Sequence, residues 1–153
     1  MNVHDNIIEI LDKNKIKYEA FEHDPSISAK ESAAARVGEE RESVKSLIFK
    51  TDKGKFILVL MSGDQRVKTN LIKKIEGCED LKLAAYDEVL NISGVPVGAV
   101  APFGLKTKLK TYFYQGILSN DHVWFAAGNL IVSIKIKPKD LLKMIDNPVI
   151  FEQ

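Results

Sequence analysis

Apolar residues recur at helical spacing near the start of the chain, where Ile7, Ile8 and Leu11 fall on one stripe. Side chains three and four positions apart share one face of a helix, so this spacing predicts an amphipathic helix. Asp5 precedes the stripe and has the short acidic side chain that caps helices. Residues 17–23 then alternate in polarity, which predicts a short strand.

A turn and a second helix are expected after this strand. Asp24 and Pro25 end it, because proline has no backbone N–H to donate. Ser28 and Glu31 have the spacing of a capping box, in which the two side chains satisfy free amides at a helix start. Alanines follow as far as Gly38, so the sequence predicts a helix between Ser28 and this glycine.

The next segments predict a hairpin and a third helix. Residues 44–51 and 55–62 are rich in branched and aromatic side chains and flank the turn-forming tripeptide 52–54. Two antiparallel strands are therefore expected here. Residues 69–75 predict a helix that ends before Gly77, the residue type that most often follows a helix.

Regular patterning fails between Gly94 and Gly104, where five glycine or proline residues interrupt a wholly uncharged stretch. This composition is unusual for an exposed loop. The other predicted elements are a helical turn at 87–90, strands at 108–114, 122–125 and 130–136, and a terminal helix that begins at Pro138. The sum is one α+β domain over residues 1–153 with at least five strands.

Composition excludes several classes of protein. The chain has 153 residues, of which 45% are hydrophobic, enough to bury a core without disulfide staples. Its 22 basic and 21 acidic residues give a net charge of +1, so it is not a DNA- or RNA-binding protein that works by bulk charge. The longest apolar run, 56–61, is too short to span a membrane. With one cysteine and no secretory signal, we expect a cytoplasmic protein.

Familiar catalytic and cofactor motifs are missing. His4, His23 and His122 do not have metal-ligand spacing, and the single Cys78 cannot build a zinc or iron–sulfur site. Phosphate-binding loops, the dinucleotide fingerprint and the G-x-S-x-G elbow are absent from the sequence. We therefore expect no metal and no cofactor.

Lys45 is the most informative charged residue. Strand alternation places it on the face that carries Leu47 and Phe49, while Val44 and Ser46 take the opposite face. In one interpretation the strand is covered on both faces and the lysine reaches solvent from its start. In the other, the ammonium lies at the floor of a pocket and stabilises negative charge that develops on oxygen.

The Gly94–Gly104 segment is the second candidate for chemistry. Glycines allow a ligand to approach the backbone closely and leave amide donors unobstructed. The alternative is an apolar loop that is simply buried under neighbouring strands. Residues 126–129 show a weaker form of the same signal, and Cys78 is interpreted as a turn residue because nothing marks its thiol as activated.

Taken in order, these segments resemble the YbaK-like aminoacyl-tRNA deacylases, a family that includes the editing domain of bacterial prolyl-tRNA synthetase and its freestanding relatives. The resemblance extends from about Ile27 to Leu142, and its most specific part is the glycine–proline segment. The segments that carry it are residues 28–36, 44–50, 62–67, 94–104 and 127–128.

The resemblance implies a curved mixed β-sheet approaching a barrel and surrounded by helices. It also implies hydrolysis of the ester that joins a wrong amino acid to the terminal adenosine of tRNA, with Lys45 as the catalytic residue. Tyr114 stands where many relatives carry aspartate, and Ser46 stands where the alanine-specific branch has asparagine. The substrate-binding residues expected on this basis are Ser46, Gly94, Gly98, Ala99, Val100, Ala101, Pro102, Gly104 and Gly128.

The leading hypothesis is a freestanding deacylase that edits mischarged tRNA in trans, with a small amino acid on tRNA(Pro) or a related tRNA. Positioned water, or the substrate's own groups, can hydrolyse an activated ester with few side chains. The rival hypotheses are a non-catalytic module that binds tRNA or an aminoacyl group, and an accessory subunit of an aminoacyl-tRNA synthetase. The partners expected are the aminoacyl-tRNA acceptor end and a synthetase, with no DNA and no membrane.

Overall fold

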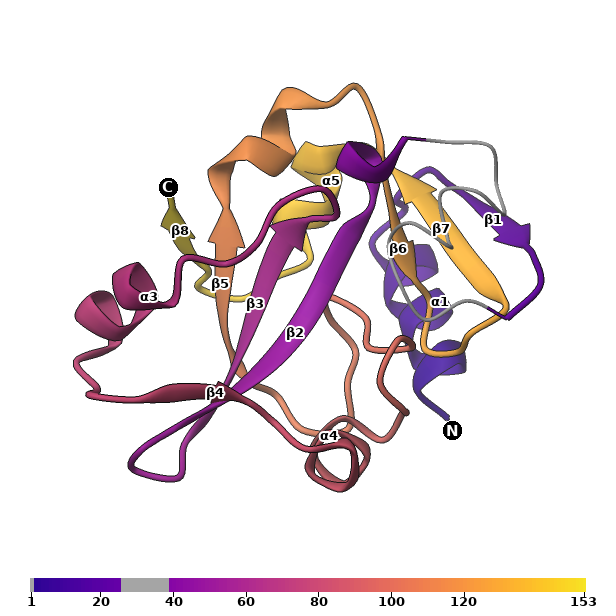
Figure 1. The fold of residues 1–153 in the computed structure, drawn as a ribbon. Coiled ribbons are helices and arrows are strands. Elements are labelled where there is room, and N and C mark those ends of the chain that lie inside the picture. The colour runs from indigo at the N-terminus through magenta and orange to yellow at the C-terminus, as the bar shows by residue number, and fades with distance from the viewer. Residues whose placement is uncertain (1, 26–38) are drawn as a thin grey trace.

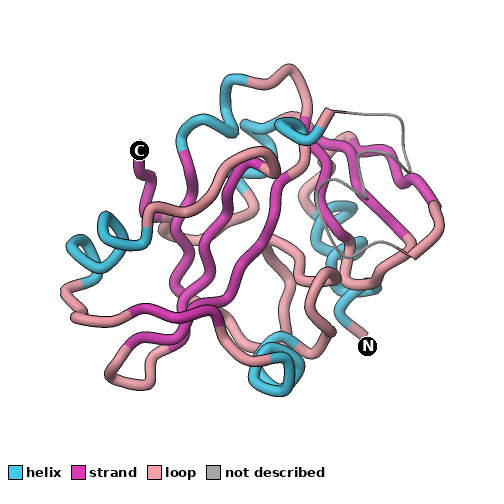
Figure 2. The backbone as a smooth tube through the Cα atoms, viewed as in Figure 1, coloured by secondary structure: helices cyan, strands magenta, loops and turns pink. Residues whose placement is uncertain are grey.

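The computed structural model describes residues 2–25 and 39–153, and its described strands form two sheets (Figures 1 and 2). The helices are α1 (Val3–Lys13), α3 (Thr69–Glu76), α4 (Tyr86–Ser93) and α5 (Pro138–Lys143), with short 3-10 helices η1 (Glu40–Glu42) and η2 (Gln115–Ser119). The strands are β1 (Tyr18–Glu22), β2 (Val44–Thr51), β3 (Phe56–Ser62), β4 (Leu81–Leu83), β5 (Lys110–Tyr114), β6 (Val123–Ala126), β7 (Val132–Ile136) and β8 (Val149–Phe151). No helix of these described ranges is long and apolar enough to cross a membrane.

The two sheets meet at one point. The larger sheet has the order β4-β2-β3-β5-β8 and is mixed, because β3, β5 and β8 run parallel while β2 is antiparallel to β3 and β4. The smaller sheet has the order β1-β7-β6 and is antiparallel. A single bridge between Ser43 and Trp124 links β2 to β6. The predicted α+β class and curved mixed sheet are confirmed, and the described strands approach a barrel without closing it.

Most elements expected from the sequence are present. The hairpin, the helix before Gly77 and the irregular 94–104 segment are confirmed, and Gly77 adopts the left-handed conformation that ends a helix. The expected cap at Asp5 is wrong, because Asn2 caps α1 and its side chain accepts a hydrogen bond from the Asp5 amide. Short strands β4 and β8 were not expected. The helix predicted over 28–38 lies outside the described residues.

The core has two parts that lie on opposite faces of β2. Val44 and Ile48 belong to the cluster enclosed by the two sheets, α1 and the 94–104 segment. Phe49 belongs to a second cluster beneath α3, and Leu47 packs against it. The alternation expected for β2 is therefore confirmed.

The 94–104 segment is part of the core rather than a surface loop, which explains why it carries no charge. Ala99 and Ala101 have no exposed surface. Gly104 packs against α1, where it accepts a hydrogen bond from Asn6 Nδ2 of 2.9 Å. A Cβ atom at Gly104 would lie 3.0 Å from Ile7 Cγ1, and the residue has a φ of +75°, so glycine is required at this position.

One buried carboxylate attaches α3 to the sheet. The side chain of Glu76 is 7% exposed, and its oxygens lie 2.9 Å from the ammonium groups of Lys55 and Lys110. The hydroxyl of Tyr112 also donates to it. Burial alone would raise the pKa of Glu76, but these three hydrogen bonds outweigh it and lower the pKa to about 2. The charged form of Glu76 therefore stabilises the fold.

We expect Glu76→Gln to lower the free energy of unfolding at pH 7 by about 2 kcal/mol, since the folded protein holds the carboxylate in its ionised form. A group with a lowered pKa contributes its stability above its ordinary pKa and loses it as pH falls towards the folded value. Stability of the wild type should thus fall between about pH 5 and pH 2 more steeply than that of the variant. Urea unfolding at several pH values measures this difference, with the exposed Glu79→Gln as control. Parallel pH curves for wild type and Glu76→Gln would contradict it.

Candidate functional site

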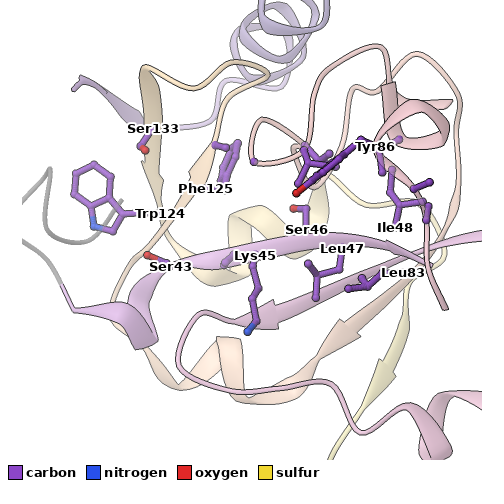
Figure 3. A pocket seen from close by; sticks show the side chains of 18 residues that line it. Ser43, Lys45, Ser46, Leu47, Ile48, Leu83, Tyr86, Trp124, Phe125 and Ser133 are labelled. Carbon is purple, nitrogen blue, oxygen red and sulfur yellow. The ribbon is translucent and has the colours of Figure 1, made fainter. Parts of the chain in front are cut away.

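A cavity of about 500 Å³ lies where the two sheets diverge. Its walls come from β2, β6 and β7, from the segment that joins β4 to α4, and from the 94–104 segment (Figure 3). The described residues that line it are Ser43, Val44, Lys45, Ser46, Leu47, Ile48, Leu83, Ala84, Ala85, Tyr86, Val89, Val97, Gly98, Val100, Trp124, Phe125, Ala126 and Ser133.

The position of the cavity follows from the strand pairing. Next to β2, strand β6 pairs at Ser43 only, and strand β4 begins its pairing at Phe49. Between these two residues the described chain pairs no strand with this edge of β2. The gap between the edges of β2 and β6 is the cavity.

Ser46 directs polar groups towards this gap. The carbonyl oxygen of Ser43 accepts a hydrogen bond from the Gly63 N–H on the β3 side of β2. The carbonyl oxygen of Ile48 accepts one from the Ala84 N–H on the opposite side. Because backbone groups alternate along a strand, the N–H and C=O of Ser46 share the direction of Ile48 and point to the unpaired edge. The Ser46 hydroxyl is buried and has no hydrogen-bond partner among the described residues. An unpaired buried hydroxyl costs free energy, so a ligand that bonds it would be favoured.

Lys45 lines the same cavity, but its side chain leaves β2 on the face of Leu47 and points away from Ser46 (Figure 3). Burial lowers the pKa of the Lys45 ammonium. Asp64 and Glu40 act in the opposite direction, and Arg66 adds to the lowering. Lys45 is the only charged side chain among the described lining residues.

The glycine–proline segment contributes only part of what the sequence suggested. Gly98 and Val100 line the cavity, and Gly98 has a φ of +93°, a conformation that favours glycine. Ala99 and Ala101 are buried in the core and are not part of the lining. Of the expected site residues, four therefore line the cavity: Lys45, Ser46, Gly98 and Val100.

The remaining expected residues lie elsewhere. Gly94 ends α4 in the left-handed conformation, and Pro102 and Gly104 line a separate cavity of about 240 Å³. At Gly128, a Cβ atom would lie 2.8 Å from the backbone nitrogen of His4 on α1. Tyr114 packs against Phe151 with ring centroids 5.7 Å apart, so it belongs to the sheet rather than to the cavity.

Several lining residues were missed by the sequence reasoning. Leu83 and Tyr86 are 62% and 78% exposed, and they stand at the mouth of the cavity. Phe125 and Trp124 approach from β6 on opposite faces of that strand (Figure 3). The apolar residues in 122–125 indicated a strand, but nothing local indicated that its edge would be open.

Ser133 is a further lining residue that the sequence reasoning missed. Its hydroxyl lies 2.8 Å from Nε2 of His23, and Nδ1 of His23 lies 2.8 Å from the carbonyl oxygen of Asp24. The serine and the histidine are 110 positions apart in the sequence. Only the pairing of β1 with β7 brings them together, which explains why spacing did not reveal them.

The arrangement suits an uncharged or weakly polar ligand of modest size. Apolar side chains supply most of the lining, and a few polar groups are placed where they can fix orientation. Within residues 2–25 and 39–153 there is no cluster of three or more histidine, cysteine or acidic side chains that could hold a metal ion.

Known proteins are similar to part of this sequence. Over 91 residues the chain is 34% identical to a proline–tRNA ligase of Bacillus licheniformis. The matched residues make up 59% of this chain and 16% of that protein. Over 102 residues it is 32% identical to a proline–tRNA ligase of Caldicellulosiruptor bescii. This match makes up 66% of this chain and 17% of that protein. The chain thus spans about a sixth of the length of these curated relatives.

A solved structure matches nearly the whole chain. It is described as a proposed trans-editing enzyme for prolyl-tRNA synthetase, with a TM-score of 0.83, 27% sequence identity, and coverage of 99% of this chain and 96% of that one. Residues 23–144 match the sequence profile described as the aminoacyl-tRNA editing domain. That range includes every described residue of the cavity, and the chain belongs to the aminoacyl-tRNA editing domain family.

Proposed function

We propose that this chain is an aminoacyl-tRNA deacylase that acts in trans and hydrolyses the ester of a mischarged tRNA in the cavity between β2 and β6. The observation that carries the proposal is the edge of β2 at Ser46, which no strand of the described residues pairs with, within a domain of the editing family. An aminoacyl ester offers a carbonyl oxygen and an amino group, which match the donor and acceptor groups of a strand edge. The cavity volume of about 500 Å³ suits an aminoacyl group with part of the ribose.

The cavity favours small, uncharged amino acids. Its described walls hold no carboxylate to bind a basic side chain, and Gly98 and Val100 line it without adding a polar side chain. Hydrophobic pockets separate ligands that differ by one methylene by only about 1–3 kcal/mol. Overlapping activity on two or three small aminoacyl groups is therefore expected, and tRNA(Pro) is the first tRNA to test because the relatives are proline–tRNA ligases.

Lys45 is the proposed catalytic charge. It borders the cavity, and its partial burial strengthens any interaction between its ammonium and negative charge that develops on the substrate. A rotation of its flexible side chain would be needed to turn the ammonium towards Ser46, and four-carbon lysine stems permit it.

A synthetase partner would help the protein hold tRNA. The net charge of +1 supplies little attraction for a polyanion at physiological salt. Binding contributed by a synthetase would compensate for this, and the rival proposal, a module that binds without catalysis, predicts tRNA retention with no ester hydrolysis.

The first test is a panel of mischarged tRNAs incubated with the full chain. We expect faster loss of small uncharged aminoacyl groups than in buffer, with tRNA(Pro) carrying alanine, serine or cysteine among the substrates. Quantifying the remaining aminoacyl-tRNA over time measures this rate. If the protein binds tRNA but accelerates the hydrolysis of no ester, the deacylase proposal is wrong and the non-catalytic binding module takes its place.

Replacing Lys45 with alanine should lower the deacylation rate about 10²- to 10³-fold, the usual effect of removing one group that stabilises a developing oxyanion. Lys82→Ala is the matched control, because Lys82 is exposed on β4 and is not part of the cavity lining. Single-turnover kinetics on the best substrate of the panel measure both variants. A Lys45→Ala protein that folds and keeps its rate would remove this lysine from the mechanism.

Gly98→Ala should reduce kcat/KM by about tenfold or more for the largest accepted aminoacyl group and less for the smallest, since it adds a methyl group to the lining. Both Gly98 and Gly54 have positive φ, so Gly54→Ala imposes the same kind of backbone strain far from the cavity. Kinetics on substrates of graded size, together with thermal unfolding, separate strain from pocket size. Equal losses across all substrate sizes would argue against a steric role for Gly98.

A further inference from the structure

Tyr86 is the most exposed of the large apolar side chains in the described residues, and it stands at the mouth of the cavity. It is 78% exposed, and Leu83 and Val97, which line the same cavity, are 62% and 36% exposed. The ring of Tyr86 extends from the start of α4 towards the side of the cavity that holds Ser46 (Figure 3). Apolar side chains that gather in the open at the rim of a pocket mark a binding surface.

The start of α4, which carries Tyr86, is attached to β2 at two points. The Ala84 N–H donates a hydrogen bond of 2.9 Å to the carbonyl oxygen of Ile48. The Glu88 carboxylate accepts a hydrogen bond of 2.7 Å from the ammonium of Lys50. These attachments hold the Tyr86 backbone in place before a ligand arrives, so less conformational freedom is lost when the ring binds one.

The two other aromatic side chains of the described lining already have contacts. Phe125 is 2% exposed and belongs to the core. The ring of Trp124 has the Lys135 ammonium 5.7 Å from its centroid and the edge-on ring of Phe21 at 5.9 Å. Within residues 2–25 and 39–153, no aromatic ring or ammonium group stacks on Tyr86. Its ring is therefore open to a planar ligand.

An aminoacyl-tRNA carries a planar group at the matching place. The aminoacyl ester and the adenine base of the terminal adenosine are attached to the same ribose ring. An ester at the β2 edge near Ser46 leaves that base at the mouth of the cavity, because the tRNA chain continues from the same ribose towards solvent. Proteins that bind single-stranded nucleic acid stack its bases on exposed aromatic side chains. Stacking also supplies affinity that the net charge of +1 does not.

We propose that Tyr86 stacks on the adenine base of the terminal adenosine and thereby positions the aminoacyl ester in the cavity, an inference that rests on the proposed function. Tyr86 holds the nucleoside and takes no part in the bond changes at the ester. Every nucleobase has an aromatic face, so the stack recognises the end of the chain by its shape. The fixed position of the ring sets how far the ester enters the cavity.

The kinetic test compares Tyr86→Ala, Tyr86→Phe and wild type in single-turnover deacylation with the full chain. Tyr86→Ala should raise the protein concentration that gives half the maximal rate about tenfold or more, and it should change the maximal rate by less than about threefold. Tyr86→Phe keeps the ring and should stay within about twofold of wild type in both values.

Leu90→Ala is the matched control, because Leu90 is 52% exposed on the same helix and is not part of the described lining. Equal losses in Tyr86→Ala and Leu90→Ala would assign the effect to the apolar surface of α4 as a whole and overturn the proposal. A Tyr86→Ala protein within about twofold of wild type, or one that loses only its maximal rate, would also overturn it.

A non-hydrolysable probe supplies a readout that a structural role would not produce. In 3′-alanylamino-3′-deoxyadenosine an amide replaces the ester, and a tyrosine ring stacked on its base moves the adenine H2 and H8 NMR signals upfield. This shift should appear with wild type and Tyr86→Phe and be absent with Tyr86→Ala. We expect 5′-AMP, which has no aminoacyl group, to bind at least about tenfold more weakly than the probe. Equally tight AMP binding would assign the ring to free nucleotides and overturn the proposal.

The probe also separates the failure of this inference from the failure of the proposed function. Where the wild type hydrolyses no mischarged tRNA, the deacylase is wrong, and the adenine signals still test the stack. An upfield shift that Tyr86→Ala abolishes supports the stack. No shift with the wild-type protein overturns it.

Discussion

The single bridge between Ser43 and Trp124 determines the geometry on which the site depends. It joins the two sheets at one end of β2, and β4 pairs with the same edge of β2 only from Phe49 onwards. Sheets twist as they extend, so edges that meet at one point separate beyond it. Within residues 2–25 and 39–153, neither a strand nor a charged cluster fills the space between them, and main-chain groups that a ligand can bond border it.

Most elements of the fold could be predicted from the sequence. Hairpin and helix signals in residues 44–62 and 69–77 are local, so short-range rules found them. Strands β4 and β8 have three residues each, and their existence depends on neighbours supplied by distant parts of the chain. Asn2 replaced Asp5 as the cap of α1 because the helix begins earlier than its apolar stripe.

The candidate site was only partly visible in the sequence. Alternation correctly separated Lys45 from Ser46, but it gave no information about which face would meet the cavity. The glycine–proline segment was recognised as unusual, and the structure divides it between core packing at Ala99 and cavity lining at Gly98. His23 and Ser133 carry no local signal, because their proximity arises from the register of two strands.

The burial of the 94–104 segment has a consequence for how substrate preference can change during evolution. Val100 lines the cavity while Ala99 and Ala101, its immediate neighbours, are packed in the core beneath it. The close-packed interior would have to accommodate an altered side chain at Val100, and a volume change of even one methylene disturbs such packing. Leu83 and Tyr86 border the same cavity from exposed positions. New specificities should therefore arise first at the mouth of the cavity, where variation is tolerated, and only later in its depth.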